Sequence, residues 1–212
     1  ALFDGKRASA GVFRAVLFPE KAPQACDNFI GLVQQGYYNG LTVSRVENQF
    51  VVEAGQGADG KGSTIWKGSR YPVEASDSLH HYAGALCVAF AQGGDVTGGN
   101  SQFYFVAALP DSVSSDQQAE LAQNGYTDSQ VAAYAAVGGL PYLDNTDTVF
   151  GQVYQGMDVV DAMACVETTK DEDGNDTWKP TEDAAITIEK VTITTYPGPV
   201  AGGEATSDSS IG

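Results

Sequence analysis

Arg45 stands among apolar and strand-forming residues in the stretch 41–56, LTVSRVENQFVVEAGQ. A guanidinium stays charged at physiological pH and is costly to bring near an apolar core unless its charge is paired or used. In a second stretch, residues 100–105, strand geometry would place Gln102 and Tyr104 on one face. A fixed cation, an amide and aromatic rings at strand spacing predict a shallow apolar pocket with a few aimed polar groups.

The composition limits the kinds of function. The 212 residues, 42% of them hydrophobic and 18% charged, are enough for one well-buried domain, which we assign to residues 1–196. Gly, Ser and Pro in residues 197–212 predict a flexible polar tail. The formal net charge of −16 argues against a nucleic-acid partner, because phosphates repel such a surface. No apolar run approaches the roughly 18 residues that would span a membrane.

The cysteines and histidines predict neither a metal site nor a cofactor. Cys26, Cys87 and Cys165 have small or apolar neighbours, which indicates buried and unreactive thiols. The only histidines, His80 and His81, are adjacent and lack the clustered ligands of a zinc site. A G-x-G-x-x-G pattern at 55–60 is not followed by a helical pattern, so we expect a surface loop there rather than a nucleotide site.

Short strands and two main helices account for most of the chain. We expect strands at 11–18, around Arg45, and at 85–91, 100–105, 148–154 and 184–196. A helix is expected from Pro23 to near Gly36, with an apolar stripe formed by Ala22, Cys26, Phe29, Ile30 and Val33. A second helix opens at residues 156–157, and the acidic stretch 168–183 reads as a hairpin. With no βαβ alternation, this order predicts a closed antiparallel barrel.

A helical hairpin interrupts this pattern at residues 111–140. Ser115 with Gln118, and Thr127 with Gln130, both fit a capping box, in which Ser or Thr is followed three residues later by Gln. Each predicts the start of a short helix inserted between two strands.

Seven short motifs, in order along residues 10–195, resemble those of the cyclophilin family of peptidyl-prolyl isomerases. They are NFIGLV (28–33), GYYNG (36–40), SRV (44–46), FVVEAG (50–55), NSQFYF (100–105), TVFG (148–151) and GMDVV (156–160). The inserted hairpin alone has no counterpart in the resemblance. The resemblance implies an eight-stranded closed antiparallel barrel capped by two helices, with a groove on its outer wall that binds prolyl peptides.

The resemblance also implies roles for individual residues. Arg45 matches the catalytic arginine. The residues that would bind the substrate are Phe50, Val51, Glu53, Ala89, Phe90, Gln102, Tyr104, Tyr142, Leu143 and Asp147. Phe103 would complete the pocket for the proline ring, whereas Phe150 is expected in the core.

Several of these positions depart from the family pattern. Ser44 and Asp147 stand where histidine is usual, Glu53 where glutamine is usual and Phe90 where asparagine is usual. Tyr142 replaces a tryptophan found in many members. The change to Glu53 matters most, because a carboxylate beside Arg45 competes for its donors.

Two functions follow from these residues. The first is an isomerase that turns X-Pro bonds in flexible or unfolded chains, with Arg45 stabilising the twisted amide. The second is a module that binds proline-containing segments without turnover. A structural salt bridge from Arg45 to Glu47 or Glu53 is the alternative role for the guanidinium.

The expected partners are proline-containing polypeptides, and the protein is expected to act as a monomer. The polar end of the sequence and its start at Ala1 favour an extracytoplasmic or envelope-anchored location, and a cytoplasmic one is the alternative.

Overall fold

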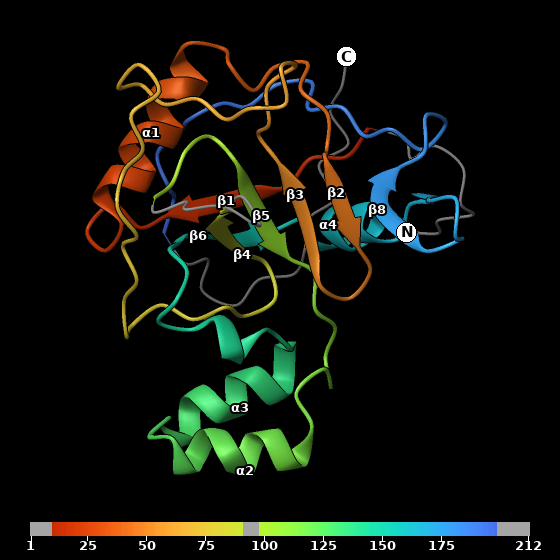
Figure 1. Cartoon of the computed structure of the whole chain (residues 1–212). Helices are drawn as coiled ribbons and strands as arrows, with labels where there is room; N and C mark the ends of the chain where they lie inside the picture. Colours follow the sequence, from red (N-terminus) through yellow and green to blue (C-terminus); the bar gives the residue numbers. More distant parts are fainter. Residues whose placement is uncertain (1–9, 91–97, 199–212) are drawn as a thin grey trace.

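The computed structural model describes residues 10–90 and 98–198, and its centre is a six-stranded antiparallel sheet (Figure 1). The strand order is β1-β6-β4-β5-β3-β2. The strands are β1 (Arg14–Leu17), β2 (Arg45–Glu47), β3 (Val51–Ala54), β4 (Ala85–Val88), β5 (Phe103–Val106) and β6 (Val149–Gln155). A separate two-stranded sheet pairs β7 (Thr168–Lys170) with β8 (Asp176–Pro180), so the acidic stretch is a hairpin as predicted.

Each face of the central sheet carries a cluster of buried apolar side chains. Successive residues of a strand point to opposite faces, and in these strands apolar residues lie on both faces. Val52 and Phe105 belong to the larger core cluster, on the face that α1 (Pro23–Gln34) covers. Val51 and Tyr104, one residue along the same strands, belong to a second cluster on the opposite face. The site residues on β3 and β5 therefore lie on a sheet that is held by packing from behind.

Helix α1 fills the larger cluster, as its apolar stripe predicts. Cys26 and Val33 are buried, and Phe29 packs its ring against Phe103 and Phe150 at centroid distances of 5.6 and 5.5 Å. Gly36, with φ of +71°, follows the end of the helix in a conformation that a side chain disfavours. Phe150 is a core residue, as expected.

Helix α4 (Met157–Ala164) follows β6 and packs Val160 and Ala164 into the same cluster. Cys165 comes directly after its last residue and is exposed, whereas the other two cysteines are buried. The prediction of a buried Cys165 is wrong, because the buried face of the helix ends at Ala164. None of the helices in the described part of the chain is both long and apolar enough to cross a membrane.

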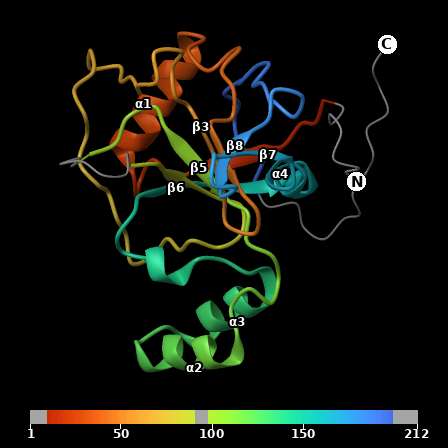
Figure 2. The ribbon, with the colours of Figure 1, turned by 45° about the vertical axis from the view of Figure 1, so that its right-hand side comes forward.

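Two helices, α2 (Ser115–Gln123) and α3 (Asp128–Val137), lie between β5 and β6 where the capping boxes predict them. Figures 1 and 2 show this pair packed side by side below the sheet. Thr127 and Gln130 form the predicted capping box of α3. The box of α2 is Ser114 with Gln117, one residue before the predicted pair. A short 3₁₀ helix, η1 (Pro141–Leu143), leads back to β6.

The structure describes residues 184–196, but they do not form the regular strand that the sequence predicts. Thr187 forms one isolated antiparallel bridge with Thr42, and the amides of Val43 and Ile188 bond to the carbonyl oxygens of Ile186 and Leu41. Pairing stops there because the partner segment ends at the turn before Leu41. In the described residues, hydrogen bonding joins six of the eight strands in one antiparallel sheet and pairs β7 with β8 in a hairpin, and closure into a barrel stays a prediction. The limits of the domain and of the tail stay predictions, because residues 1–9 and 199–212 lie outside the described part.

Candidate active site

A single row of paired residues crosses the sheet through Arg45. Antiparallel pairing sets Arg45 opposite Glu53, Glu53 opposite Tyr104, and Tyr104 opposite Cys87. Directly opposed residues point to the same side of a sheet, with Cβ atoms about 5 Å apart. The register therefore places the cation, its acidic neighbour and an aromatic ring on one outer face.

Two different carboxylates contact the Arg45 guanidinium. Its Nη2 donates to Oε2 of Glu47 at 2.5 Å, and Nη1 lies 3.8 Å from Oε2 of Glu53. The guanidinium carbon also lies 5.6 Å from the ring centre of Phe50, within range of a cation–π interaction. Neither acid grips the arginine with both of its oxygens. A guanidinium has five N–H groups, so donors remain for a ligand.

Glu53 is held in an unfavourable place for a charge. Its side chain is 19% exposed, and burial raises its pKa, although the charge of Arg45 opposes the increase. The expected competition for the guanidinium is thus present in the geometry, but Glu47 makes the shorter contact.

The apolar residues of the predicted pocket lie together on the same face. Val51, Ala89 and Tyr104 are buried in one cluster, with Phe50 and Leu143 packed against it. Phe103 is not part of it. Its ring lies on the other face, in the larger cluster, because it is one residue away from Tyr104 on the same strand.

Asp147 reaches the pocket through Tyr104. The Tyr104 hydroxyl donates to Oδ2 of Asp147 at 2.8 Å, and burial holds the pKa of this tyrosine above its ordinary value. The carboxylate at this position therefore orders the ring that would line the proline pocket. Tyr142, in η1, is 63% exposed and stands at the open side.

Of the remaining predicted residues, Ala89 and Gln102 lie next to the site, and Phe90 lies away from it. The amide of Ala89 donates to the carbonyl of Gln102 at 3.0 Å, and the Gln102 side chain accepts from Nδ2 of Asn100 at 3.2 Å. Phe90 packs against the larger core cluster, away from the cluster that holds Tyr104. The next residue, Ala91, lies outside the described part.

A buried acid that the sequence did not single out lies directly behind the pocket. Asp144 accepts at Oδ1 from the amide and Nδ1 of His81, each at 2.8 Å. Its Oδ2 accepts from Nδ1 of His80 at 2.8 Å and from the hydroxyls of Tyr126 and Tyr134 at 2.9 and 2.7 Å. Burial alone would raise the pKa of Asp144, but these hydrogen bonds lower it to about 2. We call these five residues the Asp144 cluster.

The Asp144 cluster joins the pocket to the inserted helices. The ring of His81 stacks on that of Tyr104, with centroids 6.4 Å apart and planes 17° apart. On the other side, Nε2 of His80 bonds to the side chain of Gln130 in α3 at 2.7 Å. The two adjacent histidines and the Asp two residues after Tyr142 were the available signal, but their meeting depends on the fold.

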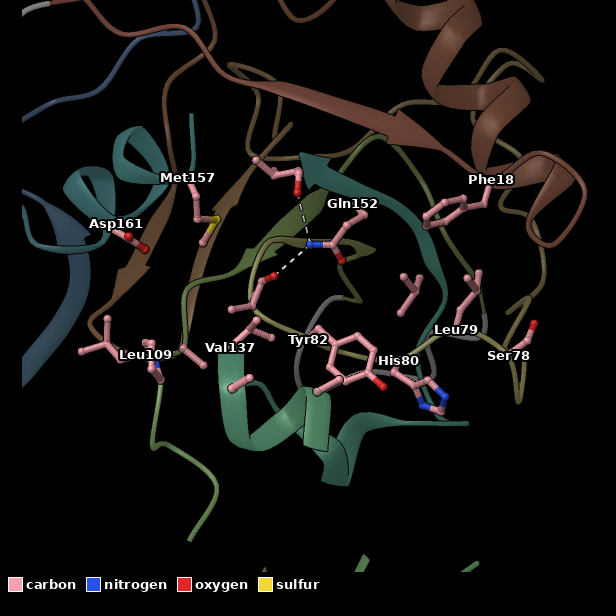
Figure 3. Close-up of a pocket in the computed structure, with 17 residues that line it drawn as sticks. Phe18, Ser78, Leu79, His80, Tyr82, Leu109, Val137, Gln152, Met157 and Asp161 are labelled. Carbon is pink, nitrogen blue, oxygen red and sulfur yellow. Dashed lines mark hydrogen bonds between the residues drawn. The ribbon is translucent and has the colours of Figure 1, made fainter. Parts of the chain in front are cut away.

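Two cavities adjoin the inserted segment. One, of about 430 Å³, is lined by Glu47, Gln49, Phe50, Ser112, Val113, Gln117, Gly139, Leu140, Pro141 and Tyr142. The other, of about 680 Å³, is bounded by α3, β6 and the first turn of α4, and no predicted site residue lines it (Figure 3). In the part of the chain that the structure describes, no three His, Cys, Asp or Glu side chains form a group suited to a metal ion.

The chain is similar to known proteins. Residues 3–193 match the family described as cyclophilin type peptidyl-prolyl cis-trans isomerase/CLD. A provisionally named peptidyl-prolyl cis-trans isomerase of Staphylococcus saprophyticus is 37% identical over 180 residues, which is 84% of each chain. A provisionally named bifunctional phosphatase/peptidyl-prolyl cis-trans isomerase of Streptococcus pyogenes is 37% identical over 190 residues. The match covers 86% of the present chain and only 37% of that relative.

Solved structures agree on the fold. A cyclophilin-type isomerase of Cryptosporidium parvum, crystallised in the presence of the dipeptide Ala-Pro, superposes with a TM-score of 0.58 at 20% identity. The match covers 87% of the present chain and 93% of that structure. The family match and the curated relatives show that the chain belongs to the cyclophilin-type peptidyl-prolyl cis-trans isomerase family.

Proposed function

We propose that the protein accelerates rotation about X-Pro bonds in flexible or unfolded polypeptides, with Arg45 as its catalytic residue. The observation that carries the proposal is a partly exposed guanidinium, with 27% of its side chain accessible, beside the apolar cluster that contains Val51 and Tyr104. Membership of the isomerase family and the named relatives support the same reaction. The proposed substrate contacts come from the second core cluster, which contains Val51 and Tyr104.

The chemistry requires only a donor and a pocket. Rotation of an X-Pro bond crosses a barrier of about 18–20 kcal/mol, because amide resonance is lost. In the twisted state the prolyl nitrogen turns pyramidal, and its lone pair becomes a hydrogen-bond acceptor. A donor aimed at that nitrogen binds the twisted state better than either planar state, which is what lowers the barrier. Phe50, Val51, Tyr104 and Leu143 would hold the proline ring while the acyl side turns.

A non-catalytic binding module is the second candidate, and one observation favours it. Glu47 accepts a hydrogen bond from Nη2 of Arg45 at 2.5 Å, and Glu53 lies 3.8 Å from Nη1, so part of the guanidinium is already paired. Under this function, the pocket would bind proline-containing segments while Arg45 stays paired.

Exchange NMR on an X-Pro peptide separates the two functions. We expect wild-type protein to catalyse cis–trans exchange and Arg45→Ala to lower the rate at least tenfold, which corresponds to about 1.4 kcal/mol. Arg70→Ala is the control, since Arg70 contacts the carbonyl of Gly98 instead of the site. Equal rates for wild type and Arg45→Ala would refute catalysis by Arg45, and peptide binding without exchange would favour the module.

A further inference from the structure

The smaller cavity continues the candidate active site toward the inserted segment. Glu47 and Phe50, two of its lining residues, are also the residues that contact the Arg45 guanidinium. Tyr142, a predicted substrate-binding residue, forms its third side. A peptide whose proline occupies the pocket next to Arg45 would therefore bring a neighbouring side chain to this cavity.

The inserted segment supplies the opposite wall, and the structure holds that wall in place. Val113 is buried, and Oγ of Ser112 accepts from the amide of Gly139 at 3.1 Å. Gly139 has φ of +153°, and a Cβ there would lie 2.4 Å from the carbonyl oxygen of His81. The backbone at Gly139 therefore packs closely against the backbone at His81. Gln117 is fixed at the start of α2 by its capping box with Ser114. The wall is thus ordered before any ligand arrives, which lowers the entropy lost on binding.

The lining matches one kind of side chain. Val113, Leu140 and Pro141 offer apolar surface, and the rings of Phe50 and Tyr142 flank it. A long aliphatic stem that ends in a cation can pack on such surface while its charge reaches a carboxylate or an aromatic face.

The charge in and around the cavity also favours a cation. Glu47 is the single charged residue among the described residues that line it, and Arg45 uses only its Oε2. The charge of Glu47 acts on the cavity, since burial and this carboxylate together raise the pKa of Tyr142. With Glu53 and Asp147 on the same face, acids outnumber the one arginine. An acidic client side chain would therefore be repelled here.

We propose that the cavity between η1, the β2–β3 turn and α2 is a specificity subsite for a lysine or arginine next to the client's proline. This inference rests on the proposed function, because the peptide must first place its proline beside Arg45. The inserted segment then contributes to substrate choice, with Gln117 as the exposed position from which the charge of the subsite can be changed.

The test uses two peptide series, with the variable residue either directly before or directly after the proline. In each series that residue is lysine, norleucine or glutamate. Both kcat/KM by exchange NMR and Kd by chemical-shift titration are measured on the full chain. In one series we expect lysine to be preferred over norleucine by about fivefold, the size of a partly exposed ion pair with a cation–π contact, and glutamate to be disfavoured.

Charge variants at Gln117 locate the effect. Gln117→Glu retains a capping-box residue and should increase the lysine preference, while Gln117→Lys should abolish it. The matched control is Gln123→Lys, an exposed change on the same helix that does not line the cavity, which should leave the preference unchanged. Rates on the norleucine peptides should be the same in wild type and Gln123→Lys.

The outcomes separate this inference from the proposed function. Equal Kd values for lysine and norleucine peptides in both series, or a preference unchanged by Gln117→Lys, would overturn the subsite even if exchange is catalysed. A lysine preference in Kd that follows the charge at Gln117 would support the subsite even if Arg45→Ala leaves the exchange rate unchanged.

Discussion

Replacement of Asp144 by asparagine tests how firmly the inserted helices are joined to the pocket. The Asp144 carboxylate accepts five hydrogen bonds from His80, His81, Tyr126 and Tyr134, and its side chain is 1% exposed. Asparagine has one acceptor oxygen and turns an NH₂ group toward donors. Several buried donors would then have no partner.

The size of the effect follows from the pKa and from burial. The pKa of Asp144 falls from its ordinary value of 3.8 to about 2, which corresponds to about 2 kcal/mol of stabilisation by the ionised form. Leaving buried donors unpaired adds to the loss, so we expect Asp144→Asn to lower the free energy of unfolding by about 3 kcal/mol at pH 7. The stabilisation by the carboxylate is complete above about pH 4 and disappears as the pH falls through about 2, because the pKa is lower in the folded state.

Urea unfolding at pH 7 and pH 3 measures both the loss of stability and its dependence on pH. The difference in the free energy of unfolding between wild type and Asp144→Asn should be about 1 kcal/mol smaller at pH 3 than at pH 7. At pH 3, Asp144 binds a proton in the unfolded wild-type chain but stays ionised in most of the folded protein. Asp183→Asn, at an exposed position, is the control and should show little difference at either pH. A loss below 1 kcal/mol at pH 7, or a difference that does not depend on pH, would show that the Asp144 cluster does not carry this stability.

Two further predictions concern Glu53 and the cysteines. Because burial raises the pKa of Glu53 above its ordinary value, wild-type kcat/KM should increase as the pH falls through that pKa, since Nη1 of Arg45 then loses the neighbouring charge. Glu53→Gln should raise kcat/KM at pH 7 and flatten that dependence, and a lower rate or an unchanged profile would count against competition for Arg45. Ellman's reagent should label one thiol, Cys165, in the native protein and three after unfolding, and fast labelling of a second native thiol would contradict the burial of the other two.

The sequence predicts the outer face of the sheet well because strand alternation is a local property. Tyr104 lies in the row that contains Arg45, and Val51 lies beside that row on the same face, as their spacing requires. The same rule, applied strictly, would have excluded Phe103 from the pocket, since it is one residue from Tyr104 and must face the other way. Chemical similarity between adjacent aromatic residues is a weaker guide than strand periodicity.

Other differences arise where the local pattern is degenerate or the contact is distant. Ser114 with Gln117 and Ser115 with Gln118 fit the capping box equally well, and the structure uses the first pair. The stretch 184–196 has strand-forming residues, yet it pairs only where residues 40–43 run beside it. Strand formation there depends on the available partner, which the stretch itself does not specify.

The position of the insertion explains why a buried acid is needed behind the pocket. The inserted segment, residues 111–140, follows β5, the strand of Tyr104, and precedes η1, which contains Leu143, so both of its ends connect to elements that carry predicted pocket residues. A flexible insertion of this length would let those two walls move apart and would add ordering entropy to every binding event. The Asp144 cluster prevents this, because one carboxylate accepts hydrogen bonds from tyrosine hydroxyls of the inserted segment and from histidine rings of the chain before β4. The insertion can therefore add a wall to the proposed substrate groove without loosening the predicted pocket beside Arg45.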